Sequence, residues 1–314
     1  PQHLIDEMNG MGEGICATLG GDCSNEEMTS KIMSVNMLPE LIKMACTAYG
    51  AWGKANSISN NGTLTQVRAL DFGTGPWGNN TVIVTHRNPL DNNMRPFVSV
   101  SFPGLVGAIT GIAKDGVGIS EKVWMVSDSD SRSNLQPGRY DGVPDVFALR
   151  EILQNTKNRA EAEMYVNSIR RTWGMWVGIG DFESQQLDLV AYRREDAIVY
   201  TDVTTPSMTS QPFLENVAYV DRHPQPSNDQ VLPTALSDFY GDITIQNSRQ
   251  IVQAHKTGDV HIAAYDYGAN QMIVSIGKIN EDGEYGPVGG DLSSWKAYNR
   301  PYLQFDLNNL WNGL

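Results

Sequence analysis

The sequence predicts an α+β fold in which two stacked antiparallel sheets lie between layers of helices. Helical patterns come first, a block of short strands follows, two helices come next, and a second block of strands closes the chain. This segregated order is typical of α+β proteins. The chain has 314 residues, 40% of them hydrophobic, so it is long and apolar enough to bury a substantial core.

The first helical patterns occupy residues 1–45. One begins near His3, and a second begins after Ser24-Asn25-Glu26-Glu27, which has the composition of an N-cap with acidic residues in the first turn. Apolar residues then recur at helical spacing as far as Met44. We expect Pro39 to interrupt this second helix, because proline cannot donate the backbone hydrogen bond that a helix interior needs.

Strand patterns begin at residue 47, and Gly, Pro or Asn separates them. A turn at 60–62 precedes an alternating strand at 63–72. Further strands are expected at 81–85, 97–102, 106–112, 117–123, 175–179, 187–192, 197–200, 217–220, 260–267 and 272–276. Helices are expected at 145–154, 159–169 and 246–254.

The charge and hydropathy of the chain argue against several functions. Its 23 Lys+Arg and 36 Asp+Glu give a net charge of -13 and a pI near 4.8, whereas nucleic-acid binding needs clustered Lys and Arg. The apolar runs, such as 82–84 and 272–276, are far shorter than the ~20 residues of a membrane span. The sequence contains no HxxEH motif, CxxC motif or histidine–carboxylate cluster, so we expect neither a bound metal nor a cofactor.

The three cysteines divide into a pair and a single residue. Cys16 and Cys23 lie seven residues apart in a Gly-rich stretch that is short and pliable enough to close a disulfide, which leaves Cys46. Two glycosylation sequons occur, Asn61-Gly62-Thr63 and Asn79-Asn80-Thr81, both in polar, turn-like segments. Together with the expected disulfide, they favour a secreted or lysosomal protein.

Cys46 stands where the helical patterns end and the first strand begins. A cut between Ala45 and Cys46 would free an α-amine with an ordinary pKa of ~8, which can act as the base for the thiol, so that no remote histidine is needed. The alternative interpretation is an inert core cysteine at the start of an edge strand.

Arg68-Ala69-Leu70-Asp71 contains two further candidate site residues, Arg68 and Asp71. Residues three apart in a strand point to opposite faces, so both charges can serve one site only if the strand ends there, as the turn-like residues 72–76 suggest. An arginine beside the cysteine would lower the thiol pKa, and Asp71 could bind the new α-ammonium. A surface arginine and a turn-starting aspartate are the alternative.

Cys46-Thr47 at a strand start, followed by Arg68-x-x-Asp71-Phe72-Gly73, resembles the cysteine N-terminal nucleophile hydrolases. The acid ceramidase-like and isopenicillin N acyltransferase-like branches of this choloylglycine hydrolase-related family look closest. Five further stretches are similar to family segments in the same order, at 102–111, 115–120, 215–223, 259–274 and 299–302.

The resemblance implies an αββα sandwich in which residues 1–45 are a helical propeptide-like segment and 46–314 bear the nucleophile, together as one globular domain. Self-cleavage between Ala45 and Cys46 would leave α and β chains that stay associated. Cys46 would form a thioester with the acyl group of a small N-acyl amine or lipid amide. Arg68 would orient the thiolate and Asp71 would bind the α-amine.

Two late residues are less simply matched. Asp221 stands where the family has an asparagine that donates to the tetrahedral oxyanion. A carboxyl can donate only when protonated, so Arg222, His223 or a backbone N–H are alternative donors. Arg300 matches an arginine that pairs with the Asp71 position in some members, and a plain surface arginine is the alternative. The same residues also allow an acyltransferase, or a catalytically silent binding or scaffold protein.

Overall fold

The computed structural model describes residues 1–41, 45–72, 80–87, 93–123, 141–172, 174–204, 211–279 and 295–313. Within these ranges the strands form two sheets, and each strand pair is antiparallel. The predicted α+β sandwich of two antiparallel sheets is therefore confirmed. The turn expected at 73–76 and Asn79 of the second sequon lie outside the described residues.

The two sheets differ in strand order. The six-stranded sheet has the order β10 (Val217–Val220), β1 (Ala45–Ala51), β2 (Thr65–Asp71), β11 (His261–Asp266), β12 (Gln271–Ile276) and β13 (Leu303–Asp306). The seven-stranded sheet runs in chain order through β3 (Val82–His86), β4 (Phe97–Ser101), β5 (Thr110–Ala113), β6 (Val117–Val123), β7 (Met175–Asp181), β8 (Leu187–Tyr192) and β9 (Ala197–Tyr200).

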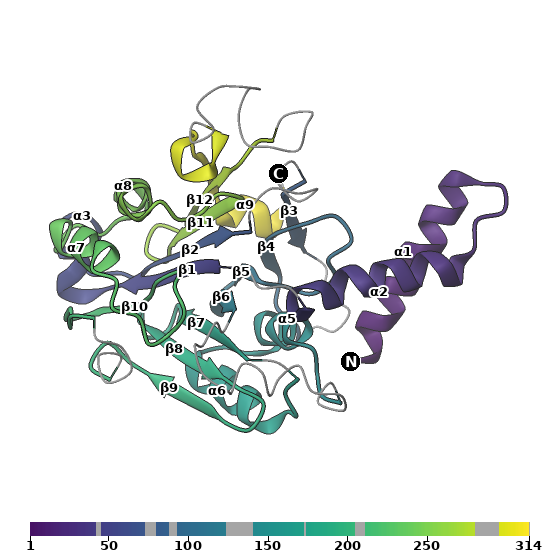
Figure 1. Ribbon diagram of the computed structural model, residues 1–314, viewed down its shortest axis with the longest axis horizontal. Coiled ribbons are helices and arrows are strands. Elements are labelled where there is room, and N and C mark those ends of the chain that lie inside the picture. Colours follow the sequence, from purple (N-terminus) through teal and green to yellow (C-terminus); the bar gives the residue numbers. More distant parts are fainter. Residues whose placement is uncertain are drawn as a thin grey trace.

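Three apolar layers hold the sandwich together, and Figure 1 shows the helices outside the sheets. Residues such as Ala48, Val98 and Trp176 fill the space between the sheets. Helices α5 (Asp145–Asn155) and α6 (Arg159–Ser168) pack on the seven-stranded sheet. Helices α7 (Val231–Asp238) and α8 (Ile245–His255) pack on the six-stranded sheet. Short helical turns complete the described chain: η1 (Gly53–Asn56), α3 (Ser57–Asn60), η5 (Ala297–Asn299) and α9 (Leu307–Asn312).

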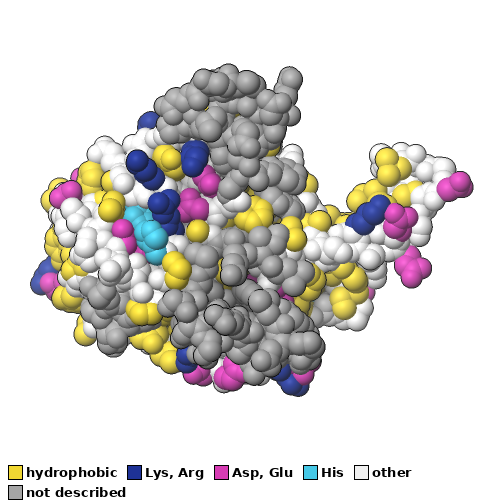
Figure 2. All heavy atoms as spheres, viewed as in Figure 1, with side chains coloured by type: hydrophobic (Ala, Val, Ile, Leu, Met, Phe, Trp, Pro, Cys, Tyr) yellow, Lys and Arg dark blue, Asp and Glu magenta, His cyan; other side chains and the backbone are white. Residues whose placement is uncertain are grey.

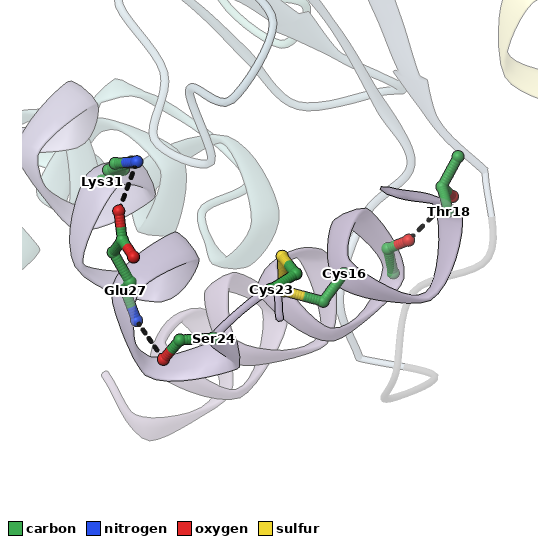
Figure 3. The surroundings of a disulfide bond; sticks show 7 residues. Cys16, Thr18, Cys23, Ser24, Glu27 and Lys31 are labelled. Atoms are coloured by element: carbon green, nitrogen blue, oxygen red, sulfur yellow. Dashed lines mark hydrogen bonds and ion pairs between the residues drawn. A yellow bond between two sulfur atoms is a disulfide. The ribbon is translucent and has the colours of Figure 1, made fainter. Parts of the chain in front are cut away.

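Helices α1 (Gln2–Leu19) and α2 (Asn25–Leu41) form a hairpin that projects from the sandwich (Figure 1). The expected disulfide between Cys16 and Cys23 is present and ties the last turn of α1 to the connection before α2 (Figure 3). The Ser24 hydroxyl accepts a hydrogen bond from the Glu27 backbone N–H at 3.3 Å, as expected of an N-cap. None of the helices in the described ranges is long and apolar enough to cross a membrane.

The expected break at Pro39 is wrong, because α2 continues through Pro39 to Leu41. Tertiary hydrogen bonds hold the last turns of this helix. On one side of Pro39, the buried Asn36 bonds the loop at 104–107, and on the other the buried Glu40 accepts the backbone N–H of Asp145 at 2.8 Å. These contacts offset the hydrogen bond that proline cannot make.

Asn36 also explains why the strand expected from residue 106 begins only at Thr110. Its Oδ1 accepts the backbone N–H groups of Val106 and Gly107 at 2.8 and 2.9 Å, so these groups are not available to a neighbouring strand. Its Nδ2 donates to the carbonyl of Gly104 at 2.8 Å. The helical hairpin is thereby joined to the sandwich by buried polar contacts as well as by apolar packing.

We expect Asn36→Ala to lower the free energy of unfolding by about 2–3 kcal/mol, because two buried backbone N–H groups would lose their acceptor. Urea unfolding of the intact chain measures the change. Ser34→Ala, on the exposed side of the same helix, is the matched control and should change stability by less than about 0.5 kcal/mol. Equal effects of the two substitutions would contradict this account of the docking.

Candidate active site

The register of β1 and β2 brings the predicted site residues together at one end of the six-stranded sheet. Cys46 lies opposite Leu70, Ala45 opposite Asp71, and Ala48 opposite Arg68. Side chains two residues apart share a face of a strand, so Cys46 and Arg68 are diagonal neighbours on the same face. Asp71, three residues beyond Arg68, belongs to the other face, and it stands directly across the ladder from Ala45.

Arg68 is fully buried, and five polar contacts hold its guanidinium. Its Nη2 donates to the Cys46 Sγ at 3.3 Å and to the Glu121 carboxylate at 2.9 Å, and its Nε donates to the Glu121 carbonyl at 3.0 Å. Its Nη1 donates to the Thr110 hydroxyl at 2.8 Å and lies 3.0 Å from the His261 Nε2. A guanidinium has five N–H donors, so these contacts leave it a single orientation, with one donor on the sulfur.

Cys46 itself is inaccessible in the intact chain, with none of its surface exposed. Burial raises the pKa of its thiol to about 12, although the nearby Arg68 acts in the opposite direction. The nitrogen of Cys46 is still part of the peptide bond to Ala45, so it cannot act as a base. The intact chain thus holds a protonated thiol beside a fixed cation.

Asp71 accepts hydrogen bonds from the other face of the sheet end. Its carboxylate receives the Thr257 hydroxyl at 2.6 Å and the backbone N–H groups of Gly258 and Asp259 at 2.6 and 3.2 Å. The Thr257 hydroxyl also lies 2.9 Å from that of Thr47, next to Cys46. Burial, and then the nearby Asp259, raise the pKa of Asp71 to about 6.

Asp221 follows β10, whose Val220 is the partner of Ala48 on β1, so it lies near the end of β1 that carries Cys46. It is fully buried and accepts hydrogen bonds from the Gln211 side chain and, at 2.6 Å, from the His223 backbone N–H. Its Oδ1 also lies 3.0 Å from the His223 Nδ1. In this arrangement Asp221 is an acceptor, so its role as an oxyanion donor stays a prediction.

Arg300 lies at the end of η5 and makes no ion pair with Asp71 among the residues that the structure describes. The pairing suggested for these two residues is therefore not present here. The arginine whose charge lowers the pKa of Asp71 is Arg222, the residue after Asp221. Arg222 donates to the Lys256 carbonyl at 2.7 Å and so joins β10 to the end of α8.

Sequence reasoning missed several residues of this site. Glu121 and Lys122 on β6 are both buried, and the Lys122 ammonium donates to the carbonyls of Val123 and His223 at 3.3 and 3.2 Å. Burial lowers the pKa of Lys122, and a negative charge on the nearby Cys46 sulfur would act to raise it. A Glu-Lys pair inside an otherwise apolar strand is the signal that could have revealed them. His261 and Thr257 carry no such signal.

Two antiparallel sheets between helices define the fold of this chain, in which a cysteine on β1 lies against a buried arginine. Its fold is that of the N-terminal nucleophile hydrolases of the choloylglycine hydrolase-like family. A Caenorhabditis elegans ortholog of N-acylethanolamine-hydrolyzing acid amidase matches with a TM-score of 0.54 and 14% identity, over 71% of this chain and 93% of that one. A mutant conjugated bile acid hydrolase from Clostridium perfringens matches with a TM-score of 0.50 and 11% identity, over 84% and 94%.

Two curated proteins of Dictyostelium discoideum are much more similar in sequence. Protein dcd1A is 32% identical over 324 residues, which cover 99% of this chain and 68% of dcd1A. Protein dcd1B is 33% identical over 288 residues, covering 90% of this chain and 55% of dcd1B. The chain belongs to the family of dcd1A, and it spans only part of the length of each relative. No protein-family model matches the chain.

The raised pKa of Asp71 predicts a specific pH dependence of stability. Between pH of about 4 and 6 the folded chain holds a proton on Asp71 that the unfolded chain has lost, so the free energy of unfolding falls as pH rises. Asp71→Asn removes this contribution and keeps an acceptor for the Gly258 N–H. We expect the stability of the variant relative to the parent to increase by about 1–2 kcal/mol from pH 4 to pH 7.

Urea unfolding of the intact chain at several pH values measures this trend. Asp6→Asn, which changes an exposed carboxyl on α1, is the matched control. A difference between Asp71→Asn and the parent that stays constant with pH would contradict the assignment of a raised pKa to Asp71.

Proposed function

We propose that this chain is a cysteine N-terminal nucleophile amidohydrolase, which cuts itself between Ala45 and Cys46 and then cleaves a linear amide bond of an N-acylated amine. One observation carries the proposal. The Arg68 guanidinium lies 3.3 Å from the Cys46 sulfur, and Asp71 is the residue paired with Ala45 in the strand register. The Cys46 sulfur thus lies beside a fixed cation, and the residue paired with Ala45 in the ladder carries a carboxyl with a raised pKa.

Self-cleavage begins when the Cys46 sulfur attacks the carbonyl carbon of Ala45. The C–S bond forms, the Ala45–Cys46 C–N bond breaks, and the proton that leaves the thiol passes to the nitrogen, which departs as the α-amine. Water then hydrolyses the thioester, which leaves a carboxylate on Ala45 and a free thiol on Cys46. Asp71 is paired with Ala45 in the ladder, and its pKa of about 6 lets its carboxyl take up and release a proton at mildly acidic pH.

The freed α-amine then supplies the base that the intact chain lacks. It takes the thiol proton while Arg68 stabilises the developing thiolate, since a nearby positive charge favours the charged form of the thiol. The thiolate attacks the amide carbonyl of the substrate, the amine product leaves with a proton, and water hydrolyses the thioester. Asp71 interacts with the α-ammonium, as a carboxylate across from the new N-terminus.

An apolar cavity supports the proposal that the substrate carries a lipid-like acyl group and that this group binds in the cavity. The cavity measures about 330 Å³ and lies between the helical hairpin and the start of α5, lined by Pro1, Ile5, Met8, Met33, Met37, Gly142, Val143, Pro144 and Phe147. Met8 and Phe147 also belong to the buried apolar cluster that contains Cys46. Each methylene buried in such a cavity contributes about 0.8 kcal/mol.

A secreted or lysosomal location is part of the proposal. The disulfide between Cys16 and Cys23 supports it, because disulfides persist in oxidising compartments. The first sequon supports it as well, since Asn61 is exposed on a turn where a glycan has room.

Incubation at acidic pH should convert the chain into two fragments, residues 1–45 and 46–314, which intact-mass analysis detects and which elute together in gel filtration. Cys46→Ala should stay uncut, and Cys46→Ser should cut much more slowly because a hydroxyl is the weaker nucleophile. Matching urea-unfolding midpoints would show that both variants are folded. A chain that stays uncut and resists a thiol-reactive acyl probe at acidic and neutral pH would support the silent scaffold protein instead.

The acyl cavity is tested with N-acyl amines of increasing chain length. Met37→Trp should fill part of the cavity and raise KM for long acyl chains on the order of tenfold, equivalent to about 1.4 kcal/mol, and should change KM for short chains much less. Met164→Trp, at an exposed methionine of α6, is the matched control. An equal change for all chain lengths would place the acyl group elsewhere. Formation of new amide with an amine acceptor would identify an acyltransferase.

A further inference from the structure

A histidine–carboxylate cluster that the sequence spacing does not show lies beside the candidate active site. It consists of Asp221 after β10, His223 two residues later, and His255 at the end of α8. One carboxylate oxygen and one ring nitrogen from each histidine lie within 4.8 Å of one another. The expectation that the chain has no such cluster is wrong, because the fold joins residues more than thirty positions apart. The proposed reaction uses neither histidine.

His255 is arranged as metal-binding histidines are. Its Nε2 lies 3.1 Å from the Asp229 carboxylate, and its Nδ1 is buried with no hydrogen-bond partner among the described residues. A proton on Nε2 donated to Asp229 leaves the lone pair on Nδ1. Metal-bound histidines usually donate their other ring N–H to a carboxylate, which sets the tautomer and the ring orientation.

His223 and Asp221 have the spacing of two ligands on one ion. The His223 Nδ1 lies 3.0 Å from the Asp221 Oδ1, a separation that a metal ion ~2.1 Å from each atom spans at an angle of roughly 90°. The ring of His223 stands edge-on to that of His255, with the ring centres 5.8 Å apart. Small side-chain rotations would bring the three groups to one ion.

The surroundings of this cluster provide negative charge and a route by which a cation can enter from solvent. Asp221 and Asp229 supply two negative charges, which offset a divalent cation, while the neighbouring Arg222 reaches to the Lys256 carbonyl at 2.7 Å. Asp221 and His255 are buried, whereas His223 is exposed and offers a route from solvent. Figure 2 shows histidine gathered with acidic and basic side chains on one face of the molecule.

We propose that Asp221, His223 and His255 bind one divalent transition-metal ion, Zn²⁺ in the first place, with Asp229 orienting His255. Two imidazoles and a carboxylate suit Zn²⁺, and a water molecule would complete a four-coordinate site. This site gives the carboxylate at position 221 a role that an asparagine amide would perform poorly. It also places a metal ion near the end of β1 that carries Cys46.

The test is a Zn²⁺ titration of the full chain carrying Cys46→Ala, which removes the one free thiol that could bind the metal and makes the readout independent of amide cleavage. After treatment with a chelator and dialysis, calorimetry should show one equivalent of Zn²⁺ per chain. His223→Ala should weaken binding at least tenfold and Asp229→Asn on the order of tenfold. His3→Ala, at a histidine outside the cluster, should bind as the parent does.

Because His223 is exposed, its substitution should leave the fold intact, and circular dichroism checks this. Co²⁺ bound in place of Zn²⁺ should show visible absorption bands of low-coordinate cobalt that disappear in His223→Ala. Absence of saturable binding to the folded parent, or unchanged affinity in both His223→Ala and Asp229→Asn, would overturn the proposal. Either result would leave the proposed amidohydrolase untouched, since that rests on Cys46.

Discussion

The buried charge of Arg68 is the constraint on which the rest of the site depends. A guanidinium with no exposed surface is costly unless every N–H has a partner, and here the Glu121 carboxylate supplies the opposite charge at 2.9 Å. Arg68 lies on β2 of one sheet and Glu121 on β6 of the other, so the ion pair also joins the two sheets. The orientation that satisfies the charge is the one that directs an N–H toward the Cys46 sulfur.

The helical hairpin contributes to the burial of the Cys46 thiol in the intact chain. Leu4 and Met8 of α1 and Ile32 of α2 pack in the same apolar cluster as Cys46, and this packing excludes water from the thiol. The thiol keeps its proton in this dry site, because the loss of hydration destabilises a thiolate more than the charge of Arg68 stabilises it. The interactions that stabilise the fold therefore also keep this thiol protonated.

Part of the site could be predicted from sequence because the relevant residues are close along the chain. Cys46 lies on β1 and Arg68 on β2, which are consecutive along the chain and adjacent in the sheet, and the family resemblance predicted that the two residues meet. The strand pattern also indicated that Asp71 belongs to the opposite face. Glu121, His261 and Thr257 could not be found in this way, because they come from distant segments that meet only when the sheets stack. The cluster of Asp221, His223 and His255 has the same origin.

Local patterns by themselves determined the α+β class, most strands, the helices predicted at 145–154 and 246–254, and the disulfide, since each depends on hydrophobic periodicity or on short spacing. Tertiary contacts decided where elements begin and end. Asn36 and Glu40 keep α2 helical through Pro39, and Asn36 occupies the backbone groups that would have extended β5. Burial and charge at the sheet interface set the protonation of Cys46 and Asp71. These properties arise from groups distant in the chain, so no local pattern contains them.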